Sequence, residues 1–204
     1  MFQFKNFMKF NLESELISKP MESKPMGMNP LKFALWLFIV SFVMVFASLT
    51  SAYIVKRSDG NWLEFELPQM FATTTVLLLI SSITMHFSLI SAKKDHLNAM
   101  KVGLVLTMGL GVAFLYGQIQ AWNQLVDMKI FLVGNTSGSF IYILSGLHGA
   151  HIVGGLVFVL IILGLAFNNQ VHQKKLLWIE MCTTFWHFLD VLWLYLFFFL
   201  ILNR

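Results

Sequence analysis

The sequence predicts an all-α membrane protein, a bundle of five transmembrane helices preceded by a polar tail. Hydrophobic residues fill 57% of the 204 positions, charged residues only 12%, and 21 residues are Phe. Soluble domains are much less apolar than this. The second observation is that apolar stretches long enough to cross roughly 30 Å of hydrocarbon recur along the chain between short polar segments. Together these observations predict an integral membrane protein.

Each expected helix is one apolar stretch bounded by polar residues. Residues 1–30 form the expected tail, because they are mixed in charge and hold three of the four prolines, unlike a cleavable signal peptide. The domain 31–204 holds five expected spans, at about 31–55, 67–92, 99–121, 139–167 and 176–202. The first span ends at "KRSDGNWLEFELP", the second at "AKKDHLN", the third at "WNQLVDMKIFLVGNTSG" and the fourth at "NNQVHQKK", all typical of loops.

The distribution of Lys and Arg predicts a cytoplasmic N-terminus and an external C-terminus. The tail and the second and fourth loops carry ten of the 14 basic residues, and the opposite side carries four. Cytoplasmic segments are normally the more basic ones. The ten are Lys5, Lys9, Lys19, Lys24, Lys32, Lys93, Lys94, Lys101, Lys174 and Lys175, and the four are Lys56, Arg57, Lys129 and Arg204. Because anionic lipid accounts for the net charge of +4, no nucleic-acid partner is expected.

The fourth span contains small residues that favour close helix packing. Hydrophobic force does not hold helices together in lipid, so transmembrane helices associate where small residues let their backbones approach. The segment "SGLHGAHIVGG" supplies such a face through Gly146, Gly149, Ala150, Gly154 and Gly155. The face suits another helix of this chain or a neighbouring subunit equally well.

The fifth span carries a polar stripe made of Glu180, His187 and Asp190. Glu180 and His187 are seven residues apart and Asp190 follows three later, so all three share one helix face. A charge buried at this depth costs about 2.5 to 3.5 kcal/mol, so the stripe must face protein or water instead of lipid. Counting about 1.5 Å per residue suggests that Asp190 meets His151, and that Glu180 meets His86 or Lys174.

Three interpretations of the stripe stay open at this point. The first is a hydrogen-bonded lock between the fourth and fifth spans, formed by Glu180, His187 and Asp190 with His148 and His151. The second is a proton or ion path, as in a transporter or channel, although no internal repeat is visible. The third is haem ligation by two histidines, although no cross-helix pair matches in depth to better than about 7 Å.

The residues predict neither a catalytic site nor a metal site within this chain. There is a single cysteine, Cys182, and no activated nucleophile or phosphate-binding loop can be built from the pattern. A lipid-binding role is more readily argued, because five basic or titratable groups should gather at the cytoplasmic face, and each Lys near an anionic surface contributes about 1 kcal/mol. These candidates are Lys93, Lys94, His172, Lys174 and Lys175. An ordinary excess of cytoplasmic charge explains them as well.

Two motifs resemble subunit III of haem-copper respiratory oxidases. The segment "WIEMCTTFWHFLDVLWLYLFFFLI" is similar to the last helix of that family, in which a Glu precedes Trp-His-Phe-x-Asp-x-x-Trp and the His lies seven residues after it. The segment "HGAHIVGG" resembles the family's His-Gly-x-His-x-x-Gly-Gly. With "FIVSFVMVFASLTSAYIV", which is similar to the first common helix, the resemblance covers roughly residues 31–202 and indicates the short five-helix form.

One position departs from the family pattern. The family usually has a glutamate where this chain has Phe42. That carboxylate faces bound lipid and the catalytic subunit in the family, and no neighbour of Phe42 is ionisable. We therefore expect Phe42 to pack as an apolar contact.

The resemblance implies a subunit without a redox centre of its own. Haem and copper would lie in partner subunits, and this chain would pack against subunit I, in a complex with subunit II and possible larger respiratory assemblies. It would hold phospholipid, sustain proton uptake and protect the enzyme during turnover, in the cytoplasmic (inner) membrane of a bacterium. Cytochrome c is the expected electron donor. Quinol oxidases and a nitric oxide reductase accessory protein share this architecture, and a transporter or proton channel is the alternative from another class.

Overall fold

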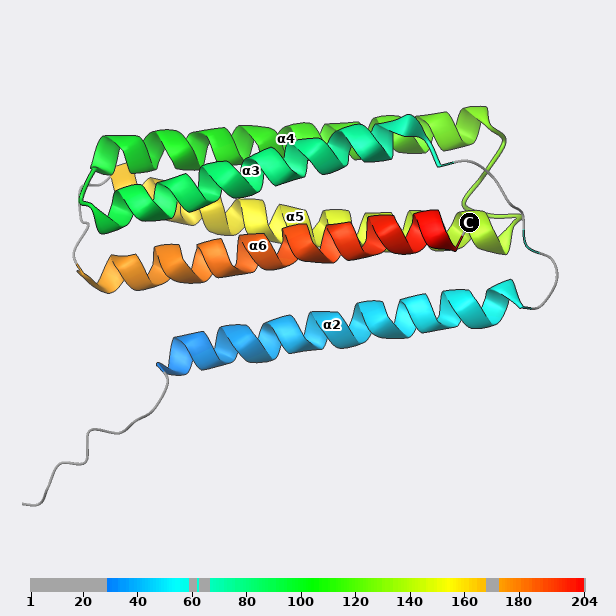
Figure 1. Cartoon of the computed structure of the whole chain (residues 1–204), viewed down its shortest axis with the longest axis horizontal. Coiled ribbons are helices and arrows are strands. Elements are labelled where there is room, and N and C mark those ends of the chain that lie inside the picture. Colours follow the sequence, from blue (N-terminus) through cyan, green and yellow to red (C-terminus); the bar gives the residue numbers. More distant parts are fainter. Residues whose placement is uncertain (1–28, 59–61, 63–66, 168–172, 204) are drawn as a thin grey trace, which may run out of the picture. The chain divides into compact units, whose positions relative to one another are not determined.

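The computed structural model describes residues 29–58, 62, 67–167 and 173–203, and the described residues contain five helices and no strand (Figure 1). The helices are α2 (Pro30–Arg57), α3 (Gln69–Lys93), α4 (Leu97–Asp127), α5 (Thr136–Phe167) and α6 (Gln173–Leu202). Each is long and apolar enough to cross a membrane. The five-helix prediction is therefore confirmed.

The chain divides into two units, Met1–Phe33 and Ala34–Arg204, and every contact described below lies within the second unit. Most of the expected tail, residues 1–28, lies outside the described residues.

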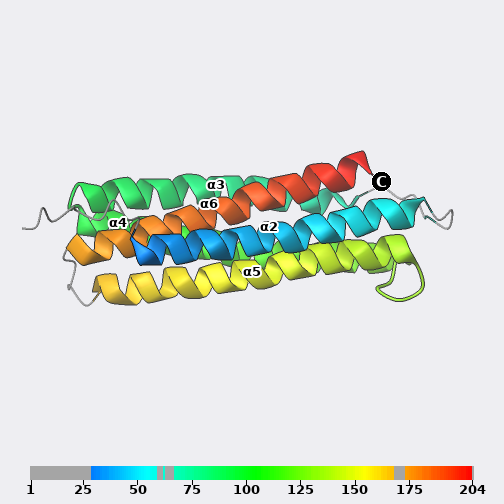
Figure 2. The ribbon, with the colours of Figure 1, turned by 90° about the horizontal axis from the view of Figure 1, so that it is seen from below.

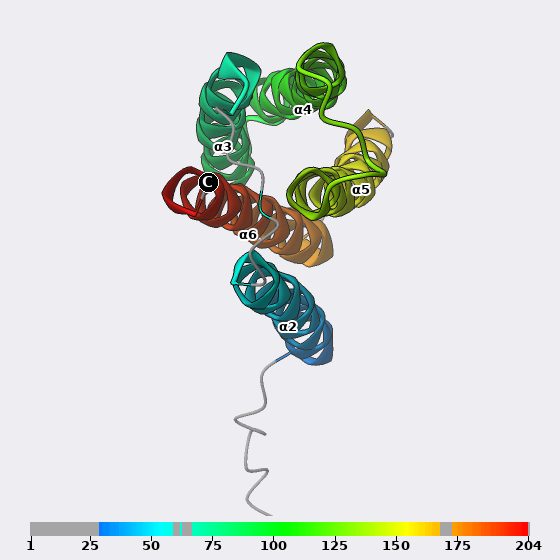
Figure 3. The same ribbon diagram turned by 90° about the vertical axis from the view of Figure 1, so that its right-hand side faces the viewer.

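Four of the helices close into a ring. Helix α3 packs against α4 and α6, and α5 packs against the same two helices. Figure 3, a view along the helices, shows this order around the ring, and the side view of Figure 2 shows that the four helices lie roughly along one common axis. Helices joined by a loop run antiparallel. Residue numbers therefore increase along one helix in the direction in which they decrease along the next.

Small and hydroxyl-bearing residues bring α3 and α4 close together. A Cβ placed on Gly103 would lie 2.9 Å from Ser88 Cβ, so only glycine fits against α3 at this point. The hydroxyls of Thr84 and Thr107 hydrogen-bond across the pair at 2.8 Å, and Ser88 donates to the backbone carbonyl of Met100 at 2.9 Å. These contacts place Thr84 of α3 at the same depth as Thr107 of α4.

Helix α4 extends further than the sequence predicts. The third span was expected to end near residue 121, but α4 continues to Asp127. The added turns are held by packing and hydrogen bonding: Leu125 is fully buried, and the indole of Trp122 donates to Ser145 Oγ at 3.0 Å. An apolar stretch shows only which residues cross the hydrocarbon of the membrane. A helix can continue beyond that stretch for as long as its residues make stabilising tertiary contacts.

The small residues of α5 do not form a single face. A Cβ on Gly155 would meet Leu189 and Trp186 of α6, whereas Gly146 and Gly149 face Trp122 and Leu115 of α4. Nothing lies within 4 Å of the corresponding position on Gly154. The four glycines thus lie on different sides of α5: Gly155 faces α6, Gly146 and Gly149 face α4, and Gly154 lies on an open side.

Candidate functional site

Two tryptophans of α6 fasten it to α3. Trp186 and Trp193 are both almost completely buried. Their indole N–H groups donate to hydroxyls of α3, Trp186 to Ser81 Oγ at 3.1 Å and Trp193 to Thr75 Oγ1 at 2.9 Å. Buried indoles need such partners, because an unpaired N–H inside a membrane protein cannot reach water. The two hydrogen bonds fix both the rotation and the depth of α6 against α3.

Trp186 also reaches the other two helices of the ring. A Cβ on Gly111 of α4 would lie 2.9 Å from its ring, and one on Gly155 of α5 would lie 3.3 Å from it. The indole therefore occupies a notch that only glycines on two helices leave open. One side chain contacts α3, α4 and α5, so the notch is the point at which the ring closes.

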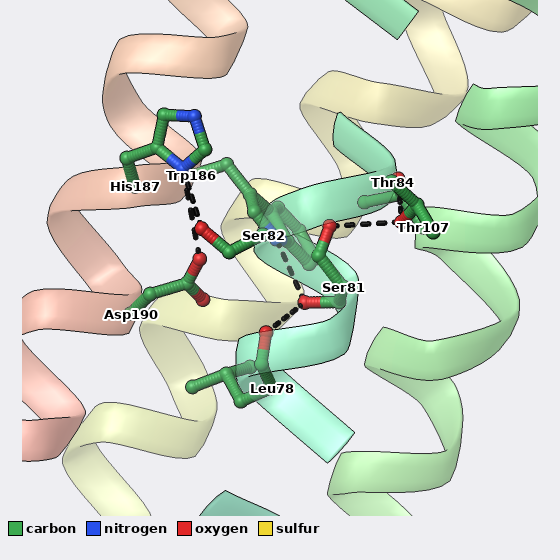
Figure 4. A network of polar contacts seen from close by, with 8 residues as sticks. All are labelled: Leu78, Ser81, Ser82, Thr84, Thr107, Trp186, His187 and Asp190. Atoms are coloured by element: carbon green, nitrogen blue, oxygen red, sulfur yellow. Dashed lines mark hydrogen bonds and ion pairs between the residues drawn. The ribbon is translucent and has the colours of Figure 1, made fainter. Parts of the chain in front are cut away.

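The polar stripe of α6 lies beside α3. His187 Nδ1 is 2.7 Å from Ser82 Oγ and 3.9 Å from Asp190 Oδ2, and Figure 4 shows Ser82 next to both residues. With a proton on Nδ1, the imidazole donates to the Ser82 hydroxyl, whose own hydrogen then points to a further acceptor. The side chain of Asp190 is only 4% exposed and that of His187 is 34% exposed.

The stripe continues toward the end of the bundle where α3 passes into α4. Lys93 Nζ lies 3.4 Å from Glu180 Oε1, and the rings of His86 and His187 have centroids 5.9 Å apart. We call this set of residues on two helices the α3–α6 polar seam. It consists of Ser82, His86, Lys93, Glu180, Thr184, His187 and Asp190.

The lock expected between the fourth and fifth spans is located elsewhere. The side-chain hydrogen bonds described for α6 reach α3 from Trp186, His187 and Trp193, and they reach α2 from Tyr195, whose hydroxyl is 3.0 Å from Thr50 Oγ1. The physical reason is composition. Where α5 meets Trp186 and Leu189 of α6 it presents Gly155, which packs closely but offers no side-chain partner, whereas α3 presents serines and threonines.

The two histidines of α5 do not meet the acidic groups of α6. His148 is completely buried, with 0% of its surface exposed, and its ring stacks on that of Trp193 with centroids 4.9 Å apart. Its ring nitrogens make no hydrogen bond with the described residues. His151 Nδ1 lies 2.6 Å from the carbonyl oxygen of Leu147. The pairing of Asp190 with His151, inferred from depth alone, is therefore not found. The described salt-bridge partner of Glu180 is Lys93, not the expected His86, and the side chain of Lys174, the other expected partner, lies outside the described residues.

Phe42 packs among rings, as expected. Its centroid is 4.0 Å from that of His151 in an edge-on arrangement and 4.3 Å from that of Phe38. Phe185 and Phe188 of α6 complete the surroundings at 6.2 and 6.4 Å. At the position where the family usually has a carboxylate, this chain has an apolar contact with the histidine of α5.

The described residues place only part of the expected lipid site. Lys93 and Lys94 are exposed at the end of α3, and Lys93 is also paired with Glu180. His172 and the side chains of Lys174 and Lys175 lie outside the described residues. Within the part of the chain that the structure describes, no group of three or more His, Cys, Asp and Glu side chains is arranged to hold a metal ion.

The hydroxyl partners on α3 were missed by sequence reasoning. Thr74, Ser81 and Ser88 are all buried and lie seven residues apart, which puts them on one helix face. Such a period of small polar residues within a transmembrane span is a recognisable signal for helix contact. The hydroxyl groups carry no charge, so they do not stand out in a span as ionisable side chains do.

Comparison with known proteins now decides the family. The family model for cytochrome c oxidase subunit III matches residues 61–202. The chain belongs to the cytochrome c oxidase subunit III family. It is accordingly subunit III of a haem-copper oxidase, of the cytochrome c or the quinol type, and an integral membrane protein. Family members are components of terminal oxidase complexes, so other oxidase subunits are its partners.

Individual relatives of the subunit III family carry both kinds of name. Cytochrome bo(3) ubiquinol oxidase subunit 3 of Buchnera aphidicola subsp. Schizaphis graminum is 30% identical over 84% of this chain and 93% of that protein. Cytochrome c oxidase subunit 3 of Thermostichus vulcanus is 28% identical over 80% of this chain and 82% of its own length. A probable quinol oxidase subunit 3 of Staphylococcus haemolyticus is 30% identical, with 81% and 85% covered.

Proposed function

We propose that this chain is the subunit III of a cytochrome c oxidase in a bacterial cytoplasmic membrane, and that it contains no redox centre of its own. It packs on catalytic subunit I in a complex with subunit II, and haem and copper lie in those partners. It holds phospholipid at its basic face, sustains proton uptake and keeps the enzyme active through repeated turnover.

The observation that carries the proposal is how the polar side chains inside the bundle are used. Trp186, Trp193 and Ser82 contribute hydrogen bonds that join α3 to α6, and Lys93 pairs with Glu180. His148 lies between the rings of Phe114 and Trp193, with both nitrogens enclosed. The nitrogens of His148 and both carboxylate oxygens of Asp190 make no hydrogen bond with the described residues. The paired groups, which hold α3 against α6, support a structural role better than ligation of haem or passage of an ion.

The electron donor is the part of the proposal with a specific alternative. Relatives of similar identity are named as cytochrome c oxidase subunits and as quinol oxidase subunits. A quinol donor is therefore the second candidate. The choice depends on the partner subunits, because the donor is expected to bind to them.

The test begins with purification of the tagged chain in mild detergent from its native membrane. We expect it to bring haem absorbance and the other oxidase subunits, and the purified complex to oxidise cytochrome c. A complex that oxidises only quinol would move the assignment to the second candidate. A colourless chain that purifies alone would overturn the oxidase role and favour a transporter.

The supporting role is tested by gentle removal of this subunit at equal haem content. We expect initial oxygen consumption to be largely retained, proton uptake to slow at higher pH, and activity to be lost sooner during continuous turnover. Oxygen consumption is followed over many turnovers at two pH values. Immediate loss of haem, or of initial activity, would show that the chain contributes directly to the redox centre.

The lipid role has its own test. Lys93, Lys94, Lys174 and Lys175 are changed together to Gln, and the phospholipid retained after delipidation is measured. We expect retention to fall, because each Lys near an anionic surface contributes about 1 kcal/mol. Lys129→Gln is the control, because this Lys lies in the α4–α5 loop, at the other end of α4. Unchanged retention in the fourfold variant would leave only the ordinary charge bias.

A further inference from the structure

We infer that the α3–α6 polar seam is the surface on which a transmembrane helix of a second oxidase subunit docks, with hydrogen-bonding side chains at the depths of His86 and His187. The inference rests on the proposed function, because it takes the partner from the same complex. It adds which face of this chain meets that partner and which chemistry the partner must offer.

The seam is open along the outer side of the α3–α6 pair. His86 and Thr184 are exposed, and the side chain of His187 is 34% exposed. The residues flanking them are of the kind that faces lipid: Ile83 is 69% exposed and Val191 is 64% exposed. Polar side chains therefore form a stripe within an otherwise apolar surface.

The depth of the stripe rules out lipid as its natural neighbour. His86 precedes Lys93 by seven residues, which places it about 10 Å further into the helix than the Lys93–Glu180 pair. At this depth the acyl chains offer no hydrogen bond, and exposed polar groups in membrane helices normally face protein. Within the described part of the chain, the ring of His86 lies 5.9 Å from that of His187 and His86 makes no hydrogen bond.

His187 is only partly satisfied by its own chain. One ring nitrogen, Nδ1, lies against Ser82 Oγ, and the described residues offer no hydrogen bond to the other nitrogen, Nε2. An imidazole has two hydrogen-bonding positions, so one remains for an outside partner. His148 is different, because its ring is completely enclosed by the bundle and cannot be reached from outside.

The opposite side of the ring shows what a lipid-facing surface of this chain looks like. Thr84 and Thr107 lie at one depth on antiparallel helices, so Val105 of α4 lies at the depth of His86. Val105 is 46% exposed, and its exposed neighbours Val102 and Leu106 are equally apolar. At this depth the α3–α6 side thus exposes imidazole and hydroxyl groups where this face of α4 exposes aliphatic side chains, which is what a helix with complementary hydrogen-bonding groups requires.

The inference is tested by photocrosslinking in native membranes. A photoreactive p-benzoylphenylalanine is introduced at His86 or at Thr184, and at Val105 as a control of matched depth. Each full-length variant is expressed in place of the native chain. After irradiation the complex is purified, its haem absorbance is recorded, and crosslinked products are separated and identified by mass spectrometry.

We expect the probes at positions 86 and 184 to yield an adduct with one transmembrane segment of a second subunit, and the probe at 105 to yield lipid adducts. Lipid adducts at all three positions in a complex that retains haem would overturn the inference and leave the proposed function standing. A protein adduct at 105 but not at 86 or 184 would overturn it in the same way. Variants and native chain that all purify without haem would overturn the proposed function, and the inference with it.

Discussion

Helices α6 and α2 are held in the bundle by different means. Helix α6 is positioned by directional contacts: the indoles of Trp186 and Trp193 donate to α3, and Gly111 and Gly155 receive the Trp186 ring. From Ala34 onward, α2 contacts the bundle mainly through rings, with two hydrogen bonds in its second half. One joins Thr50 Oγ1 and the Tyr195 hydroxyl and the other runs from the Tyr53 hydroxyl to the carbonyl of Asn203, both at 3.0 Å. Phe42 lies against His151, and Tyr53 lies against Phe140 and Phe199 with centroids 5.5 and 5.1 Å away.

The difference concerns how sharply each helix is specified. A hydrogen bond or a close fit against a glycine forms at only one register and one rotation of the helix. Contacts between rings keep most of their energy when the helix slides or turns slightly. In the apolar 18-residue stretch of each helix, 50% of the residues of α6 are buried, compared with 22% of those of α2. Single substitutions should therefore perturb the position of α6 strongly and that of α2 weakly.

The largest effect is expected from Gly111→Ala. The new methyl group would lie 2.8 Å from Leu156 and 2.9 Å from the buried Trp186 ring, so one of them must move. Overpacking of this kind typically costs about 1 to 3 kcal/mol. We expect a lower thermal unfolding midpoint for the purified complex in detergent.

Gly109→Ala is the matched control for this prediction. It makes the same change two residues away on α4, where nothing lies within 4 Å of the new methyl group. Alanine also favours a helix over glycine by about 1 kcal/mol. The control should be neutral or slightly stabilising. Equal effects at positions 109 and 111 would mean that the notch does not fix α6.

The sequence was sufficient to predict the number of spans and most of their limits. Hydropathy reports how far each helix runs through hydrocarbon, and it placed α3, α5 and α6 to within about three residues. It could not predict the extension of α4 to Asp127, because those turns are held by Leu125 and Trp122 after the apolar stretch has ended.

The partners of the polar residues could not be predicted from depth. Depth along a helix is a single coordinate, whereas contact also requires the rotation of both helices and their order around the ring. The arithmetic placed Asp190 beside His151 of α5, but its side chain lies beside His187 and α3. Rotation is encoded in the spacing of Thr74, Ser81 and Ser88, which marks the α3 face that meets its neighbours.

An intermediate effect is expected from Thr75→Val. The change keeps the shape of the side chain and removes the acceptor for the Trp193 indole, which lies 2.9 Å away and is buried. Hydrogen bonds between membrane helices average about 0.6 kcal/mol, with larger values where a buried donor is left unpaired. We expect a loss of about 1 kcal/mol in unfolding free energy, together with a change in Trp fluorescence.

Thr73→Val provides the control, because Thr73 is exposed and its hydroxyl bonds only its own helix, at 3.4 Å from the carbonyl of Gln69. It should leave both stability and fluorescence unchanged. If Thr75→Val behaved in the same way, the tryptophan contacts would be packing contacts and α6 would resemble α2 after all.

The smallest effect is expected from Phe42→Leu, on the helix held by rings. Leucine keeps the position apolar but loses the edge-on contact with His151 and the contact with Phe38. Aromatic pairs contribute roughly 0.5 to 1.5 kcal/mol each, and we expect a loss near the lower limit, because Phe42 is only partly buried and the remaining rings can close over the gap. The informative measurement is hydrogen exchange, which should quicken in α2 and stay unchanged in α3 and α4. Phe87→Leu makes the same replacement at a ring that is 51% exposed on α3, and it should change neither helix. A general loss of protection throughout the bundle after Phe42→Leu would show that α2 is as firmly specified as α6, and that the aromatic layer is part of one cooperative core.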